Sequence, residues 1–225
     1  MSTSLHLPPR ALLHPRHWPS WLGVALLSAA LLLPRRVRDR LAALVGDAQW
    51  RRNAKARETV RLNLAACFPD WSDAERRRVE REHFRAYARA MADLPIAWWD
   101  RHAHAPRRHC TVTGAEHLEA ARRDGRPVIL LTPHVTGVDF GGMAVSRLVP
   151  LSTMANRLSD PVLQWIVNRA RERHGEVWLR EGGIRPVVRG LRRGLVFYYM
   201  PDEDHGPRNS VFAPFFGIEK ATLTS

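Results

Sequence analysis

The sequence predicts an α/β fold in which a mainly parallel central sheet is flanked by helices. Two observations carry this prediction. From about residue 111 onward, short apolar runs that are typical of buried strands alternate with helical segments, and such alternation favours parallel strands joined by helical crossovers. Ahead of this region lie an apolar helix and a basic helical segment, which we expect to be an N-terminal addition to the α/β domain.

The strands and helices of the α/β region follow one another along the chain. We expect strands over residues 127–132, 151–155, 176–179 and 195–200, and helices over residues 140–148, 160–175 and 184–193. Asp160 and Pro161 form a typical helix start, and Gly194 ends the last helix. Ligands of parallel sheets gather at the carboxyl ends of the strands, so functional residues are expected at that edge.

An uncharged, largely apolar stretch runs from Trp18 to Leu33. As a helix its 16 residues would extend over only ~24 Å, less than the ~30 Å hydrocarbon core of a bilayer. A short or tilted span, an uncleaved signal-anchor and a buried helix all fit this pattern. We expect a single membrane-anchor helix over residues 18–34, preceded by a basic leader over residues 1–17. Because arginines follow the stretch, the next domain is expected on the cytoplasmic side.

A basic helical segment is expected over residues 35–110, before an α/β domain over residues 111–225. Ser72 and Glu75 have the spacing of a helix-capping box, and Pro95 is expected to end the helix that they begin.

The formal net charge of +13 is carried almost entirely by arginine. Such a charge indicates an anionic partner, although an excess of arginine also reflects GC-rich coding. Over residues 35–65 the basic residues are broken by apolar ones, which favours surface helices against anionic lipid headgroups. No nucleic-acid-binding motif is present, so nucleic acid is not expected as a partner. Cys67 and Cys110 have no metal-like spacing, and a reducing compartment fits them best.

His134 follows the first predicted strand of the α/β region, and Asp139 stands five residues later. A histidine beside a carboxylate can take a proton from a hydroxyl, because imidazole titrates near neutrality and the carboxylate fixes its tautomer. On a continuous helix the two side chains would diverge by ~140°, so they can meet only across a turn. Pro133 and Gly137 make a strand–turn–helix corner plausible. The pattern alone also fits a surface histidine that caps a helix.

Charged residues follow three other predicted strands. Arg157 and Arg180 come after the strands at 151–155 and 176–179, where arginines suit phosphate or carboxylate ligands. Asp202 and Asp204 belong to an acidic run after the last strand. Acidic clusters can bind metal ions, but this one lacks the spacing of an EF-hand loop, and we expect no metal.

Two blocks of sequence together resemble a known family. They are His134-x4-Asp139 after an apolar strand, and Gly183-Ile184-Arg185-Pro186 followed by YYMPDEDHGPRNSVFAPFFGIEKAT at residues 198–222. These blocks resemble the lipid A biosynthesis acyltransferases of the lysophospholipid acyltransferase-like superfamily, the late enzymes that add secondary acyl chains to the Kdo-bearing lipid A precursor. The Pro-Asp-Glu-Asp-His-Gly-Pro form is especially similar to the myristoyl-transferring branch, and lauroyl-transferring relatives carry close variants.

The resemblance implies an O-acyltransferase that moves a fatty acyl chain from acyl carrier protein to a hydroxyacyl hydroxyl of the Kdo-lipid A precursor. His134 would be the general base and Asp139 its orienting partner, with the backbone N–H groups of Thr136, Gly137 and Val138 stabilising the oxyanion. No cofactor is required, because the thioester is already activated. The candidate substrate-binding residues are Arg157, Arg171, Arg173, Arg180, Asp202 and Asp204.

The implied setting is the cytoplasmic face of the bacterial inner membrane, with acyl carrier protein, the lipid A precursor and the anionic membrane surface as partners. Family members continue for some tens of residues past Thr222, so a chain that stops at Ser225 is expected to be incomplete at its C-terminus. A glycerophospholipid acyltransferase and a non-catalytic basic membrane-peripheral protein are the alternatives. The Pro-Asp-Glu-Asp-His-Gly-Pro run argues against the first of these.

Overall fold

The computed structural model describes residues 9–99, 110–202, 206 and 210–223. The chain forms two compact units. The first contains residues 1–28 and 95–200, and the second contains residues 29–94 and 201–225.

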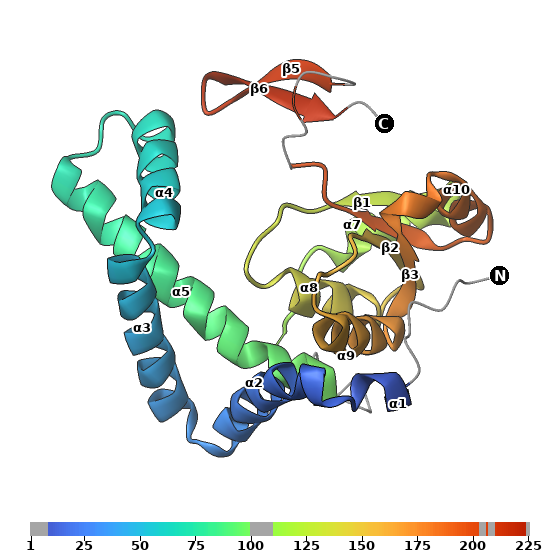
Figure 1. Ribbon diagram of the computed structural model, residues 1–225. Helices are drawn as coiled ribbons and strands as arrows, with labels where there is room; N and C mark the ends of the chain where they lie inside the picture. The colour runs from blue at the N-terminus through green and yellow to red at the C-terminus, as the bar shows by residue number, and fades with distance from the viewer. Residues whose placement is uncertain (1–8, 100–109, 203–205, 207–209, 224–225) are drawn as a thin grey trace. The chain divides into compact units, whose positions relative to one another are not determined.

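The first unit is built around a four-stranded sheet in the order β1-β4-β2-β3, with every neighbouring pair parallel (Figure 1). The strands are β1 (Ile129–Leu131), β2 (Leu151–Ala155), β3 (Gly175–Leu179) and β4 (Val196–Tyr199). The prediction of a mainly parallel sheet is confirmed, and each predicted strand is present. Among the four strands of this sheet β4 comes last along the chain, yet it pairs with both β1 and β2 and therefore lies inside the sheet.

Three helices connect these strands: α8 (Val138–Val145), α9 (Pro161–Glu172) and α10 (Arg185–Arg192). A fourth helix, α7 (Ala115–Arg123), precedes β1. The chain passes from β1 across to β2, continues to β3 at the far edge of the sheet, and then returns to β4 between β1 and β2. Helices α8 and α9 therefore lie on one face, and α10 lies on the other (Figure 1). The predicted start of α9 is confirmed, since the Asp160 carboxylate accepts hydrogen bonds from the backbone N–H groups of Val162 and Leu163.

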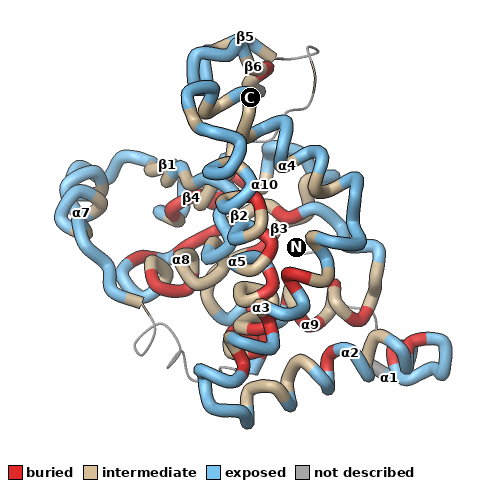
Figure 2. Tube along the Cα trace, turned by 90° about the vertical axis from the view of Figure 1, so that its left-hand side faces the viewer, coloured by how far each residue is buried: buried red, intermediate tan, exposed pale blue. Residues whose placement is uncertain are grey.

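The core of the first unit forms where the strands meet these helices. Figure 2 shows buried positions along α9 and the strands, whereas α7 is mostly exposed. One cluster joins three buried residues with four half-buried apolar ones: Val149, Leu151, Val196, Leu118, Val128, Leu130 and Val145. Burying these side chains supplies the main driving force for closing the layers.

The apolar run near the N-terminus is not one continuous helix. It forms α2 (Trp18–Ala29) and the 3-10 turn η2 (Ala30–Leu32), after two short elements, α1 (Pro9–Leu12) and η1 (Pro15–His17). Within the first unit, Trp21 meets the ring of Trp165 edge-on at 6.0 Å. Over the described residues, the structure contains no helix that is both long enough and apolar enough to cross a membrane.

The second unit contains α3 (Arg35–Arg52), α4 (Ala54–Cys67) and most of α5 (Asp73–Trp99). Small residues let α3 and α5 approach closely: Ala42 packs with Ala88 and Ala92 in one buried cluster. A Cβ at Gly46 would lie only 2.7 Å from the backbone of Arg85.

Arginine–carboxylate pairs reinforce this helix packing. The Asp47 carboxylate accepts hydrogen bonds of 2.7–2.8 Å from the guanidinium groups of both Arg81 and Arg85. These bonds, first from Arg81 and then from Arg85, hold the pKa of Asp47 well below its usual range. Arg38 is buried and donates to Asp93 at 2.8 Å. Part of the arginine excess therefore has a structural purpose.

The predicted capping box at the start of α5 is confirmed. The Ser72 N–H donates to Glu75 at 2.8 Å, and the Glu75 N–H donates back to the Ser72 hydroxyl at 3.3 Å. The prediction that Pro95 ends this helix is wrong, because α5 continues through Pro95 to Trp99. Pro95 does mark the residue at which the chain passes from the second unit to the first.

An antiparallel hairpin in the second unit was not predicted. It consists of β5 (Ser210–Phe215) and β6 (Ile218–Leu223). Its two-residue turn places Phe216 and Gly217 at positive φ, as the right-handed twist of a tight hairpin demands. The Phe216 ring meets Phe68 at 5.2 Å, and Phe68 stacks on Trp71.

Candidate active site

The predicted strand–turn–helix corner is present. β1 ends at Leu131, and α8 begins at Val138. Between them the Val135 N–H donates to the Pro133 carbonyl at 2.9 Å, and the Val138 N–H donates to the Val135 carbonyl at 3.0 Å. His134 therefore lies exposed in the turn.

The prediction that Gly137 supplies an unusual backbone angle for this corner is wrong. Gly137 precedes α8 with φ of −99° and ψ of 10°, which residues with side chains also adopt. Its conformational freedom is therefore not what allows the turn.

Asp139 lies in the first turn of α8 and is held by Arg171 near the end of α9. The Arg171 Nε donates to Asp139 Oδ1 at 2.7 Å, and Nη2 donates to Oδ2 at 3.2 Å. Both side chains are partly buried. Two parallel, charge-assisted hydrogen bonds fix the plane of the carboxylate as well as its position. The carboxylate at the corner is thus oriented by a second helix of the same unit.

Tyr198 in β4 contacts both ends of the corner. Its hydroxyl lies 3.3 Å from the carbonyl oxygen of Val138 and 3.4 Å from the hydroxyl of Thr132. It therefore contacts both the residue after β1 and the first residue of α8. A Cβ at Gly141 would lie 3.2 Å from this hydroxyl, and one at Gly142 would lie 3.6 Å from the ring. The two adjacent glycines of α8 leave room for the tyrosine.

Arg157 and Arg180 follow two neighbouring strands, β2 and β3, at their carboxyl ends. Arg180 opens the 3-10 turn η3 (Arg180–Gly182), which follows β3 directly. Arg157 donates to Glu181 of the same turn at 3.2 Å, and both side chains of this pair are well exposed. The two arginines thus follow strands that end at the same edge of the sheet.

Arg173 has partners inside the protein. Its guanidinium donates to the carbonyl oxygen of Trp98 at 2.8 Å and to that of Ala97 at 3.5 Å. These carbonyls belong to the last turn of α5, whose final carbonyl groups have no partner within the helix. Arg173 therefore caps a helix end.

The other predicted site residues are placed as follows. Among the three predicted oxyanion donors, the Val138 N–H already donates within the turn, whereas no acceptor is described for those of Thr136 and Gly137. Asp202 belongs to the second unit, where its carbonyl oxygen accepts a hydrogen bond from the Lys220 ammonium group. Asp204 lies outside the described residues.

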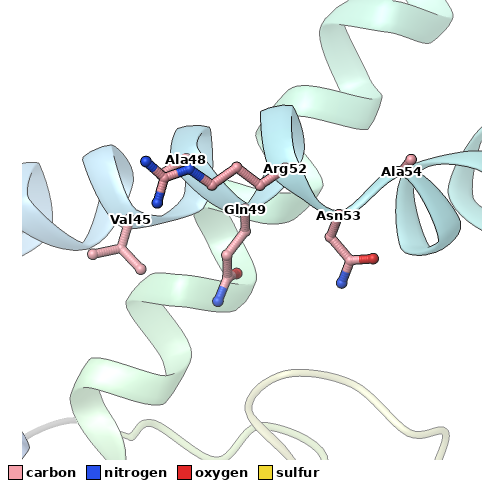
Figure 3. A pocket seen from close by; sticks show the side chains of 6 residues that line it. All are labelled: Val45, Ala48, Gln49, Arg52, Asn53 and Ala54. Atoms are coloured by element: carbon pink, nitrogen blue, oxygen red, sulfur yellow. The ribbon is translucent and has the colours of Figure 1, made fainter.

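A pocket in the second unit contains none of these residues. It lies where α3 meets α4 and is lined by Val45, Ala48, Gln49, Arg52, Asn53 and Ala54. Figure 3 shows the side chains of Val45, Gln49 and Asn53 pointing to the same side of the chain. With Arg52 as the one ionisable residue of its lining, this pocket offers no acid–base pair.

Comparison with known proteins adds to this geometry. Residues 9–225 match the family model described as bacterial lipid A biosynthesis acyltransferase. The chain is 36% identical to a lipid A biosynthesis myristoyltransferase of Escherichia coli over 213 residues, which cover 93% of this chain and 65% of that protein. It is 31% identical to a lipid A biosynthesis lauroyltransferase of the same organism, over 96% of this chain and 70% of the relative.

A lipid A biosynthesis acyltransferase of Haemophilus influenzae is 33% identical over 94% of this chain and 67% of its own length. The chain thus spans about two thirds of the length of the curated relatives it matches. With this identity across nearly its whole length, the chain belongs to the bacterial lipid A biosynthesis acyltransferase family.

Proposed function

We propose that this chain carries the acyl-transfer site of a lipid A acyltransferase. The site would move a fatty acyl chain from acyl carrier protein to the hydroxyl of a hydroxyacyl chain on the Kdo-lipid A precursor. The observation that carries the proposal is the corner between β1 and α8. It presents His134 in an exposed turn and holds Asp139 in a fixed plane through Arg171.

In the proposed reaction His134 is the general base. It takes the proton of the acceptor hydroxyl while the oxygen attacks the thioester carbonyl carbon. The new C–O bond forms, the C–S bond then breaks, and the proton returns to the departing thiol. Asp139 stabilises the imidazolium that forms in between. Each carboxylate oxygen accepts one bond from Arg171 and keeps a further lone pair for an imidazole N–H.

The developing oxyanion requires hydrogen-bond donors close to the histidine. We assign this role to the backbone N–H groups of Thr136 and Gly137, which precede α8 and have no described acceptor. The N-terminal end of a helix also carries a partial positive charge, which favours an anion there.

Charged residues at the rim would position the anionic substrates. Arg157 and Arg180 suit the phosphates of the acceptor, since guanidinium groups bind phosphate through paired hydrogen bonds. We assign Asp202 and Asp204 to acceptor binding on their family-like motif alone. We place the reaction at the cytoplasmic face of the bacterial inner membrane, where the lipid acceptor meets the soluble donor.

The test is transfer by the full-length protein in a host that lacks its own late acyltransferases. Mass spectrometry of the host's lipid A should show the mass of one added acyl chain with the wild-type protein and none with His134→Ala. His117→Ala is the matched control, because His117 is strongly exposed on α7. Transfer retained by His134→Ala would refute the assignment. Acylation of a glycerophospholipid instead of lipid A would refute the substrate class.

A further inference from the structure

The outer face of α10 carries a row of arginines. Arg185, Arg189 and Arg192 are spaced by four and three residues, so their side chains project from one side of the helix, and all three are exposed. The opposite side is buried: a Cβ at Gly190 would lie 2.3 Å from the ring of Trp178 in β3. The helix thus packs on the sheet through small and apolar residues and turns its charge outward. We call these three residues the basic ridge.

Salt bridges within the described part of the chain do not account for the basic ridge. Over the described residues no carboxylate pairs with any of its members, whereas the neighbouring Arg193 pairs with Glu176 at 2.6 Å. Like charges three or four residues apart on a helix repel one another. The helix dipole disfavours Arg185 at the N-terminal end but favours Arg189 and Arg192 in the last turn. The mutual repulsion of these three guanidinium groups is explained if the ridge serves a partner outside the chain.

Two exposed apolar residues accompany the basic ridge. Ile184, just before the helix, is 58% exposed, and Val188 one turn later is 40% exposed. The strip therefore combines positive charge with a small apolar contact, a combination that suits an acidic protein better than a phosphate group alone.

The basic ridge begins close to the proposed site. α10 follows η3 at the carboxyl edge of the sheet, and the turn with His134 follows β1 at the same edge. β1 and β3 are separated by two strands, so the whole edge spans only ~14 Å. An extended phosphopantetheine arm is long enough to cross that distance.

We propose that the basic ridge of α10, with Ile184 and Val188, is the docking surface for the acidic acyl carrier protein that delivers the acyl chain. This inference rests on the proposed function, which supplies the donor. Opposite charges would steer the carrier onto the ridge and fix its orientation, and the arm would then reach across the sheet edge to His134.

The test is a titration of fluorescently labelled acyl carrier protein with the full-length protein and two triple variants. In the first variant, Arg185, Arg189 and Arg192 are all replaced by Glu. The control carries the same charge change at Arg77, Arg78 and Arg123, which are exposed residues of α5 and α7. The ridge variant should raise the Kd for the carrier at least about tenfold at low salt, and the control should leave it within about twofold. An unchanged Kd in the ridge variant, or an equal rise in both, would overturn the proposal.

Two further measurements separate the possible causes. With acyl-coenzyme A, which has the same thioester arm and no carrier protein, the ridge variant should transfer at the wild-type rate. An equal loss with both donors would overturn the docking role.

Loss of binding to anionic vesicles with unchanged carrier binding would assign the ridge to lipid. Failure of the wild-type protein to transfer from either donor would refute the proposed function, whereas the Kd would still decide the docking surface.

Discussion

The guanidinium of Arg171 and the carboxylate of Asp139 are joined by two hydrogen bonds of 2.7 and 3.2 Å between α9 and α8. This pair fixes the first turn of α8 relative to a helix that the chain reaches only after β2. Arg171 was predicted from the family resemblance to bind substrate, but it has a carboxylate partner inside the protein. We infer that it positions Asp139.

Replacing Arg171 with Lys should lower the rate of acyl transfer by roughly tenfold to a hundredfold, because an ammonium group cannot reproduce a planar two-point contact. The melting temperature should change by only a few degrees, since the pair is partly exposed. Arg147→Lys is the control, as Arg147 is an exposed arginine after α8. The measurement is transfer rate against substrate concentration. A wild-type rate for Arg171→Lys would show that orientation of Asp139 does not matter.

Tyr198→Phe removes the hydroxyl that contacts Val138 and Thr132. The loss of these contacts should lower the free energy of unfolding by roughly 0.5–1.5 kcal/mol and slow transfer several-fold through a looser corner. Tyr199→Phe, one residue later on the same strand, should leave the rate unchanged. Gly141→Ala gives an independent check, because its Cβ would approach the Tyr198 hydroxyl to 3.2 Å. If both Tyr198→Phe and Gly141→Ala transfer normally, the corner does not depend on this packing.

Local sequence signals predicted much of the first unit. The strands are short, largely apolar runs, and the start of α9 is defined by Asp160 and Pro161, so each could be recognised within a few residues of sequence. The corner was predictable for the same reason, because Pro133 stops any helix from forming across it.

Contacts between distant residues could not be predicted in this way. Arg171 and Asp139 are 32 residues apart, and Tyr198 lies 60 residues from Val138, so only the folded sheet brings them together. The prediction for Pro95 was wrong for a different reason. Proline usually ends a helix because it lacks an N–H, yet α5 accommodates it and continues for four residues. Local propensity was overridden there by tertiary structure.

Gly46→Ala should destabilise the second unit. Its Cβ would lie 2.7 Å from backbone atoms of Arg85, which cannot move without separating α3 from α5. We expect a loss of roughly 1–3 kcal/mol in the free energy of unfolding. Gly23→Ala is the matched control: Gly23 is also within a helix, but no atom lies within 4 Å of its added Cβ, so it should stabilise by about 0.5–1 kcal/mol. Denaturant unfolding measures the free energy of unfolding of both variants. If Gly46→Ala were as stable as Gly23→Ala, the close contact between α3 and α5 would be disproved.

Asp47 should make the second unit sensitive to acid. Its pKa in the unfolded chain is near 3.8, and the hydrogen bonds from Arg81 and then Arg85 lower it in the folded state. The folded state therefore binds this proton less readily than the unfolded state. The stabilisation is fully present above about pH 5 and is lost as the pH falls below about 4 toward the folded pKa.

The melting temperatures of the wild-type protein and of Asp47→Asn, compared across pH, measure this effect. The wild type should melt higher at pH 7, and the difference should shrink steadily below about pH 4. Asp70→Asn is the control, because Asp70 is an exposed residue between α4 and α5. A difference that stays constant down to pH 2.5 would mean that the Asp47 pairs contribute nothing through ionisation.

The exposed side of α2 should bind lipid. Trp18, Leu22 and Leu26 recur every four residues and are each at least 60% exposed, whereas Val24 on the other side is buried. A helix that packs on protein along one side and exposes an apolar stripe along the other can lie in the plane of a membrane interface. The stripe suggests such an in-plane position for the expected N-terminal anchor.

Replacing Leu22 and Leu26 together with Asp should weaken binding to anionic vesicles by at least about tenfold, because two leucines would no longer enter the interface. The matched control replaces Leu13 and Leu148 with Asp, since both are exposed leucines outside α2. Vesicle flotation gives the bound fraction, and a blue shift of tryptophan emission on binding reports burial of Trp18. Equal binding by the wild type and the α2 variant would exclude this helix as the membrane contact, because two charged residues cannot enter the interface without a large loss of affinity.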